Sequence, residues 1–217
     1  MLKSTENKQG ILITFEGVDN CGKTTQIERL RIWLEASGHS VRIFRGLGST
    51  AFGESARELL LHRKESHMTT MTQNFLFLAS LSQGWEENVI PSLQAGSCVI
   101  LDRFTDSSLA YQGYGSGIDL KFLKAAHKTI CGERSPDVTF LLDIPVSMIR
   151  QRQTQPADKI ESAPDVFHES VRGGFIELAA KDSRRFRMID GTMPPEAVEL
   201  VIRGRVVELL HKGGRYG

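Results

Sequence analysis

Eight residues near the start of the chain constrain its fold more than any other feature. Gly17–Thr24 read GVDNCGKT and match the pattern G-x-x-x-x-G-K-[ST], in which backbone N–H groups surround phosphate oxygens. The preceding segment 11–16 (ILITFE) is β-branched and aromatic, and predicts a buried strand. Residues 23–37 carry apolar side chains at helical spacing before Gly38. A strand, a glycine-rich turn and a helix in this order predict a phosphate-binding loop at a helix N-terminus.

The residue types in this loop predict separate roles in nucleotide binding. Lys23 reaches the β- and γ-phosphates, and the Thr24 hydroxyl ligates Mg²⁺. ATP and Mg²⁺ are therefore the expected cofactors. The alternative is a glycine-rich turn that only caps a helix, which the complete motif in its strand–helix context disfavours. The residues expected to contact the nucleotide are Gly17, Asn20, Cys21, Gly22, Lys23, Thr24 and Thr25.

The rest of the chain alternates apolar strands with helices. Because the strands are continuous apolar runs, they favour a parallel sheet covered on both faces. We expect an α/β protein with the three-layer P-loop NTPase fold, in which a five-stranded parallel sheet carries helices on both faces and a short lid. One domain is expected over residues 1–217, with the polar segment 153–164 as the lid. The predicted strands are 11–16, 41–45, 97–101, 138–143 and 186–189, and the predicted helices are 23–37, 52–62, 72–88 (closed near Pro91), 107–114, 119–131, 146–153, 165–181 and 195–211.

Composition limits the partners. The formal net charge is +1, so no global field attracts nucleic acid or an anionic membrane, and neither is expected as a partner. The first ten residues are polar, unlike a signal peptide, and no apolar run approaches the ~20 residues of a membrane span. The three cysteines have no metal or redox spacing and suggest reduced thiols in a cytoplasmic protein. Small-molecule nucleotides are the expected partners.

Two adjacent residues at the end of the third predicted strand suggest a kinase. Asp102 can hold Mg²⁺ through water, and Arg103 can grip an acceptor phosphate with its bidentate guanidinium. In parallel sheets ligands bind at this carboxyl edge. The alternative is a surface ion pair at a strand end. A GTPase is disfavoured because the guanine-reading sequence N-K-x-D is absent.

Four ordered segments resemble the thymidylate kinase family over most of the chain. FEGVDNCGKTTQ (15–26) is similar to the family's P-loop, including the acidic Asp19, and FGESARELLL (52–61) is similar to its G-E-x-x-R-x-L-L stretch. DRFTDSSLAYQG (102–113) is similar to its D-R-[YF]…S-x-x-A-Y-Q-G signature. DKIESAPDVFHESVRGGFIELA (158–179) is similar to its D-R-x-E…F…V-R-x-G-Y-x-x-L-A segment.

The resemblance implies phosphoryl transfer from MgATP to a pyrimidine deoxynucleoside monophosphate, most readily dTMP, by a homodimer. It implies that Asp19 holds the sugar 3′-hydroxyl or helps to organise Mg²⁺, and that Arg45 and Arg103 grip the acceptor phosphate. We expect Lys23, Arg103, Asp19 and Lys159 to be the catalytic residues, with Lys159 standing where the family's lid usually has an arginine. The other implied contacts are Phe77 stacking on the base, Ser108 near the base edge, Tyr111 under the deoxyribose, Arg152 against adenine, and residues 158–161 in the lid.

These assignments have plainer alternatives. Phe77 lies in an apolar helix and Tyr111 beside apolar residues, so both are also compatible with ordinary core packing. Arg152 and Glu161 are also compatible with solvated charges.

The chain departs from the family pattern at three places. Leu81 stands where the family carries a base-contacting arginine, and 46–50 read GLGST instead of E-P-G-G-T. The P-loop has Asn20 where some members carry the catalytic arginine, and 153–158 (QTQPAD) contain none. Lys159 or Arg150 is the candidate substitute, although a lysine lacks the planar fork. These departures keep two alternatives open: a kinase for a different or base-modified pyrimidine monophosphate, and a weakly active nucleotide-binding paralogue.

Overall fold

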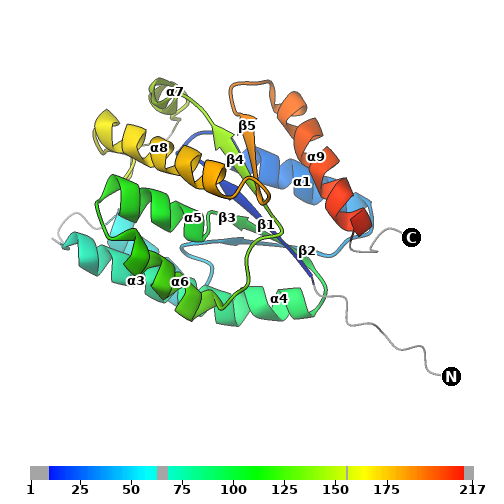
Figure 1. The fold of residues 1–217 in the computed structure, drawn as a ribbon, viewed down its shortest axis with the longest axis horizontal. Helices are drawn as coiled ribbons and strands as arrows, with labels where there is room; N and C mark the ends of the chain where they lie inside the picture. Colours follow the sequence, from blue (N-terminus) through cyan, green and yellow to red (C-terminus); the bar gives the residue numbers. More distant parts are fainter. Residues whose placement is uncertain (1–9, 63–67, 155, 213–217) are drawn as a thin grey trace.

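Five parallel strands form the centre of the molecule. A computed structural model describes residues 10–62, 68–154 and 156–212, and its sheet has the strand order β2-β3-β1-β4-β5 (Figure 1). All six residues of β1 are buried, as expected of the central strand in a sheet covered on both faces. The strands are β1 (Ile11–Glu16), β2 (Val41–Arg45), β3 (Cys98–Asp102), β4 (Val138–Asp143) and β5 (Phe186–Asp190).

The register brings the carboxyl ends of three strands to one edge. Phe15 of β1 and Arg45 of β2 both lie opposite Asp102 at the end of β3. The residues that follow β1 and β3 therefore meet beside the end of β2. The expected fold class is confirmed, and the predicted strand positions agree with the observed ones to within one residue.

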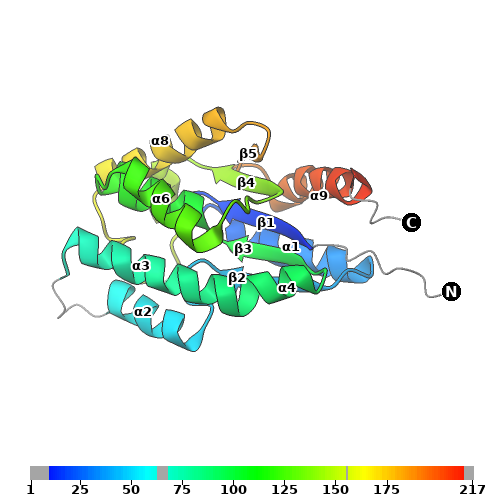
Figure 2. The same cartoon turned by 60° about the horizontal axis from the view of Figure 1, so that its bottom comes forward.

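Helices cover both faces of the sheet. On one face, α1 (Lys23–Ala36) packs against α9 (Pro195–Lys212). The other face carries α3 (Thr70–Gly84), α4 (Ile90–Gln94), α5 (Thr105–Ser108) and α8 (Asp165–Lys181), with α6 (Leu120–Cys131) beside α3 and α2 (Ala51–Leu61) packed on α3 (Figure 2). The short α7 (Val146–Gln151) follows β4. No helix in the described part of the chain is long and apolar enough to cross a membrane.

The helix predicted to close near Pro91 does not end there. A π-helical turn, η1 (Trp85–Val89), joins α3 directly to α4, and α4 continues to Gln94, so that the segments run on as one rod in Figure 2. Proline has no N–H to donate to the preceding turn, and a wider π turn accommodates an interrupted hydrogen-bond ladder. The predicted helix at 107–114 is likewise mostly a π-helical segment, η2 (Leu109–Gly115).

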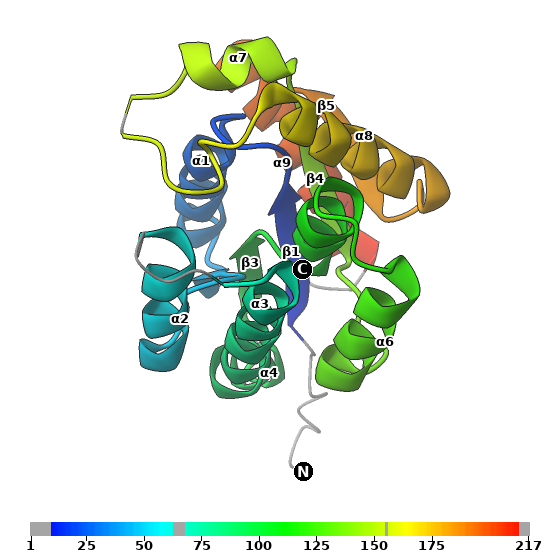
Figure 3. The ribbon, with the colours of Figure 1, turned by 90° about the vertical axis from the view of Figure 1, so that its left-hand side faces the viewer.

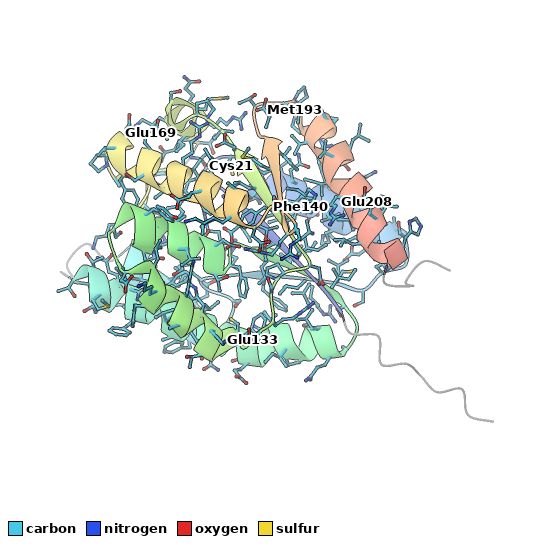
Figure 4. All side chains as sticks on the ribbon, viewed as in Figure 1. Cys21, Glu133, Phe140, Glu169, Met193 and Glu208 are labelled. Carbon is cyan, nitrogen blue, oxygen red and sulfur yellow. The ribbon has the colours of Figure 1, made fainter. Side chains whose placement is uncertain are left out.

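Two apolar clusters hold these layers together. The larger one includes Phe15 and Phe140, whose ring centroids are 5.3 Å apart, and Phe140 lies among the interior side chains of Figure 4. The smaller one contains Leu81, together with Trp85 and Phe104, whose rings stack at 5.5 Å. Leu81 is therefore part of the core beneath α3.

The start of α2 offers a test of stability. Thr50 is the N-cap, and its hydroxyl accepts a hydrogen bond of 2.9 Å from the Gly53 N–H. Thr50→Ala leaves this donor unpaired, and we expect it to lower the free energy of unfolding by about 1 kcal/mol. Thr50→Ser keeps the oxygen and should stay within a few tenths of a kcal/mol of the wild type. Urea denaturation measures both, and equal destabilisation by the two variants would contradict the capping role.

Candidate active site

A cavity of about 320 Å³ opens at the carboxyl edge of the sheet. It lies where the P-loop, the end of β2 and the loop after β3 meet, which is where the register placed the strand ends. Many of the residues expected at a nucleotide site meet here. They are Asp19, Asn20, Lys23, Thr24, Arg45, Phe77, Asp102, Arg103 and Tyr111.

The P-loop wraps around the ammonium group of Lys23. Its Nζ donates to the Val18 carbonyl at 3.0 Å and to the Gly17 carbonyl at 3.4 Å. Gly17 has φ 134°, and a Cβ there would lie 2.4 Å from the Leu142 carbonyl oxygen, so no other residue fits. Among the other expected contacts, Cys21 is buried near the start of α1 (Figure 4) and Thr25 is exposed.

Arg103 is the centre of a hydrogen-bonded cluster on the cavity floor. Its guanidinium donates to the Gly17 carbonyl at 2.7 Å and to Ser107 Oγ at 3.2 Å, and it forms an ion pair with Asp19. The Tyr111 hydroxyl donates to Asp19 Oδ2 at 2.9 Å. Burial opposes ionisation of Asp19, but the charges of Arg103 and Lys23 and the bond from Tyr111 outweigh it and lower its pKa. Asp19 is therefore a fixed negative charge between two cations.

The donors at the loop suit a magnesium ion. Thr24 and Asp102 both line the cavity, and Asp102 Oδ1 is buried without a hydrogen-bond partner among the described residues. Those residues hold no cluster of three or more His, Cys, Asp or Glu side chains that could bind a metal. Magnesium does not need such a cluster, because it commonly takes one or two protein oxygens together with water and substrate phosphates.

The structure does not place Ser108 on the cavity wall. Ser108 is fully buried, and its Oγ has no hydrogen-bond partner in the described part of the chain. Ser107 and Gln112 line the cavity instead, from either side of it in sequence. Consecutive residues of a helix point about 100° apart, so a motif match in sequence does not by itself decide which serine faces the site.

The predicted lid descends over the cavity. Figure 3 shows the segment between α7 and α8 running down towards the end of α2, where the Lys159 N–H donates to the Leu61 carbonyl at 3.3 Å. Asp158 Oδ1 accepts from the N–H groups of Ile160 and Glu161, both at 2.8 Å, and all three residues line the cavity. Burial raises the pKa of Glu161.

The three basic residues expected near the lid, Lys159, Arg150 and Arg152, do not line the main cavity. Lys159 is exposed and lines a smaller neighbouring cavity of about 190 Å³. Arg150 is ion-paired with Asp165 at the start of α8, at 2.7 Å. Arg152 is the C-cap of α7 and does not line the main cavity. The structure brings none of these three side chains onto the main cavity wall.

Four residues at the site were missed from the sequence. Arg57 and Gln112 line the cavity, and both fall inside segments that carried the family resemblance, which was the available signal. Ser107 also lines it and receives a bond from Arg103. Glu16 lies beneath the cavity floor as the last residue of β1; its place at the carboxyl end of a strand was the available signal, but the sequence predicted no role for it.

Comparisons with known proteins agree on one family. The family model described as thymidylate kinase matches residues 15–202. The chain is 38% identical over 214 residues to a thymidylate kinase of Desulfovibrio desulfuricans, covering 94% of this chain and 99% of that protein. It is 39% identical over 203 residues to a thymidylate kinase of Bifidobacterium longum, covering 92% and 98%. The crystal structure of thymidylate kinase from Ehrlichia chaffeensis matches with a TM-score of 0.75 at 30% identity, covering 91% of this chain and 98% of that chain.

Proposed function

The chain belongs to the thymidylate kinase family, and from this premise we propose how its residues divide the transfer of a phosphoryl group from ATP to dTMP. The protein is an ATP-dependent nucleoside monophosphate kinase, and nothing favours the alternatives of another acceptor or a non-catalytic paralogue. The main support for this proposal is that residues of the P-loop and of the Arg103 cluster line the same cavity.

The two substrates meet end to end in this cavity. Lys23 and the N–H groups of the P-loop hold the β- and γ-phosphates of ATP, while Arg103 and Arg45 hold the phosphate of dTMP. A phosphate oxygen of dTMP then attacks the γ-phosphorus, and the bond from that phosphorus to the β–γ bridging oxygen breaks. ADP and dTDP result. Because proteins do little covalent chemistry in such transfers, these residues act by positioning and charge neutralisation.

Thr24 and Asp102 are the proposed holders of Mg²⁺, which would supply positive charge to neutralise the phosphates during transfer. Asp19 and Tyr111 shape the sugar side of the site. Burial raises the pKa of Tyr111 well above its usual range, so the hydroxyl stays protonated and keeps donating to Asp19. The carboxylate of Asp19, which lines the cavity, is the proposed acceptor for the sugar 3′-hydroxyl.

A panel of acceptors tests the substrate. We expect dTMP to give the highest kcat/KM among dTMP, dUMP, dCMP, UMP and CMP, with MgATP as donor and ADP release as the readout. Leu81 offers no hydrogen bond, so the margin over dCMP should be smaller than an arginine would give; one hydrogen bond to a charged group is worth about 1.5–3 kcal/mol. Another nucleotide surpassing dTMP would contradict the assignment.

We also propose that two copies of the chain pair through α3 and α6. Phe75 and Phe122 are 55% and 36% exposed and meet edge to face with centroids 6.2 Å apart, beside exposed Met71. Contiguous exposed aromatic surface favours a protein interface.

Three buried thiols without a disulfide are consistent with a reducing compartment, which supports a cytoplasmic location.

Sedimentation tests the pairing. The wild type should have twice the mass of the chain, and Phe75→Glu should shift it to the monomer. Val166→Glu is the matched control, because Val166 is 74% exposed and lies on α8, which contributes neither ring of the aromatic pair, and this variant should remain dimeric. A monomeric wild type would refute the pairing.

A further inference from the structure

A buried carboxylate beneath the cavity has no role in the mechanism above. Glu16 ends β1 and has no exposed surface. Its Oε1 accepts a hydrogen bond of 2.8 Å from the Phe104 N–H, and its Oε2 accepts one of 2.5 Å from the Ser107 hydroxyl. Both donors belong to the loop and helix that follow β3, so the carboxylate ties the end of one strand to the turn after its neighbour.

Both donors follow Arg103 closely in the chain. Phe104 is the next residue, and Ser107 accepts a bond of 3.2 Å from the Arg103 guanidinium. Arg103 has φ 68°, in the left-handed region that side chains other than glycine seldom adopt. Such a backbone persists only where surrounding contacts fix it. Glu16 supplies two of these contacts.

Gly46, which follows β2, packs closely against the other side of this turn. A Cβ on Gly46 would lie 2.6 Å from the Arg103 carbonyl oxygen, and the Gly46 N–H bonds the Asp102 carbonyl at 3.0 Å. The turn is thus enclosed by β2 on one side and held by Glu16 on the other. A loosened turn would move the guanidinium relative to Asp19 and the cavity.

We propose that Glu16 is a positioning residue for phosphoryl transfer, which holds the turn after β3 so that Arg103 points at the acceptor phosphate. This rests on the proposed role of Arg103. Glu16 does not touch a substrate; it acts through the Phe104 N–H and the Ser107 hydroxyl.

The charges around Glu16 decide its protonation. Burial raises its pKa to about 7, and the neighbouring Asp106 adds to this effect, while the bonds from Ser107 and Phe104 and the charge of Arg103 oppose it. Asp106 is itself ion-paired with Arg185 at 2.5 Å. Because the pKa of Glu16 in the folded protein lies above the ordinary value of a glutamate, the protonated form stabilises the fold at low pH. That contribution is lost as the pH rises through about 7.

Steady-state kinetics tests the proposal. Glu16→Ala should lower kcat/KM for dTMP by about 10–100-fold, the range expected when a catalytic group is misplaced, with the KM for ATP within about twofold of wild type. Glu16→Gln keeps an acceptor for the Phe104 N–H and can still bond Ser107, so it should recover most of the loss. Ser107→Ala, which removes one link, should fall between them and serves if Glu16→Ala does not fold.

Thr14→Val is the matched control. Thr14 lies two residues earlier on the same strand, equally buried, and its hydroxyl bonds Thr139 at 2.7 Å without touching the Arg103 turn. We expect Thr14→Val to lower the melting temperature and to leave the KM for dTMP unchanged. Equal losses of kcat/KM for dTMP in Thr14→Val and Glu16→Ala would reduce Glu16 to a general stabiliser and overturn the proposal.

A double mutant distinguishes the proposed role of Glu16 from that of Arg103. If Glu16 acts through Arg103, Glu16→Ala should change kcat/KM for dTMP little in an Arg103→Ala background. Additive losses would overturn the role of Glu16 while leaving that of Arg103 intact. An Arg103→Ala variant with wild-type kinetics for dTMP would instead overturn the proposed grip on the acceptor itself.

A pH series adds a readout that does not depend on activity. The melting temperature of the wild type relative to Glu16→Gln should fall as the pH rises from 5 to 8, because only the wild type must ionise a buried carboxyl. A constant difference over this range would contradict a titrating carboxyl at this position.

Discussion

Lys23→Ala is expected to lower kcat by about 10³-fold or more, because removal of one cation or donor from a phosphoryl-transfer site costs 10²–10⁵ in rate. The Lys23 ammonium sits within the P-loop, where it donates to the Gly17 and Val18 carbonyls and to Cys21 Sγ at 3.6 Å. No carboxylate in the described part of the chain forms an ion pair with it, so the change breaks no salt bridge of the fold and removes only one of the charges that lower the pKa of Asp19. ADP release from MgATP and dTMP measures the effect.

A thermal melt provides the control for this variant. The melting temperature should change by only a few degrees, since the lost bonds are to carbonyls of a loop held by Gly17 and α1. Lys23→Arg keeps the charge but not the compact ammonium, and we expect it to remain at least tenfold below wild type. More than a tenth of wild-type turnover in Lys23→Ala would contradict the proposed role in charge neutralisation.

Arg103→Ala is expected to lower kcat/KM for dTMP by about 10²–10³-fold, because truncating one partner of a buried, hydrogen-bonded charge pair costs about 2–5 kcal/mol. The change removes the proposed grip on the acceptor phosphate and also leaves Asp19 without its ion-pair partner. Both effects fall on the acceptor side of the cavity. The KM for ATP should therefore change much less than the KM for dTMP.

Arg103→Lys separates charge from geometry. A lysine supplies the positive charge but cannot bond Gly17, Ser107 and Asp19 at once with a planar fork. We expect it to recover part of the affinity for dTMP and little of kcat. If Arg103→Lys matched the wild type, the fork would be unnecessary, and the cluster on the cavity floor would contribute only charge.

The structure shows where the two candidate substitutes for the family's arginine lie. Sequence comparison within the motif suggested Lys159 or Arg150 as a substitute. Lys159 lies on the smaller cavity and Arg150 bonds Asp165, so neither side chain lines the main cavity. Arg57 does line it, and the segment of family resemblance at 52–61 was the only signal in the sequence that could have pointed to it.

The sequence by itself determined the features that depend on local chemistry. The P-loop followed from glycines, one lysine and one threonine between a strand and a helix, and each of these preferences acts within a few residues. The strands followed from continuous apolar runs, and their order of alternation with helices decided the parallel sheet. The residues that bind the acceptor phosphate could be predicted only through the family resemblance, since Asp102 and Arg103 alone were also compatible with a surface ion pair.

Only the tertiary structure decided what depends on packing between distant segments. The rod through Pro91 forms because a π turn and the core beneath α3 tolerate the missing hydrogen bond, which overrides the local preference of proline to end a helix. The choice of Ser107 over Ser108 depends on the rotation of one short helix against β1. The positioning role of Glu16 depends on the register that places β1 beside β3, because the backbone donor to this buried carboxylate lies 88 residues away in the sequence.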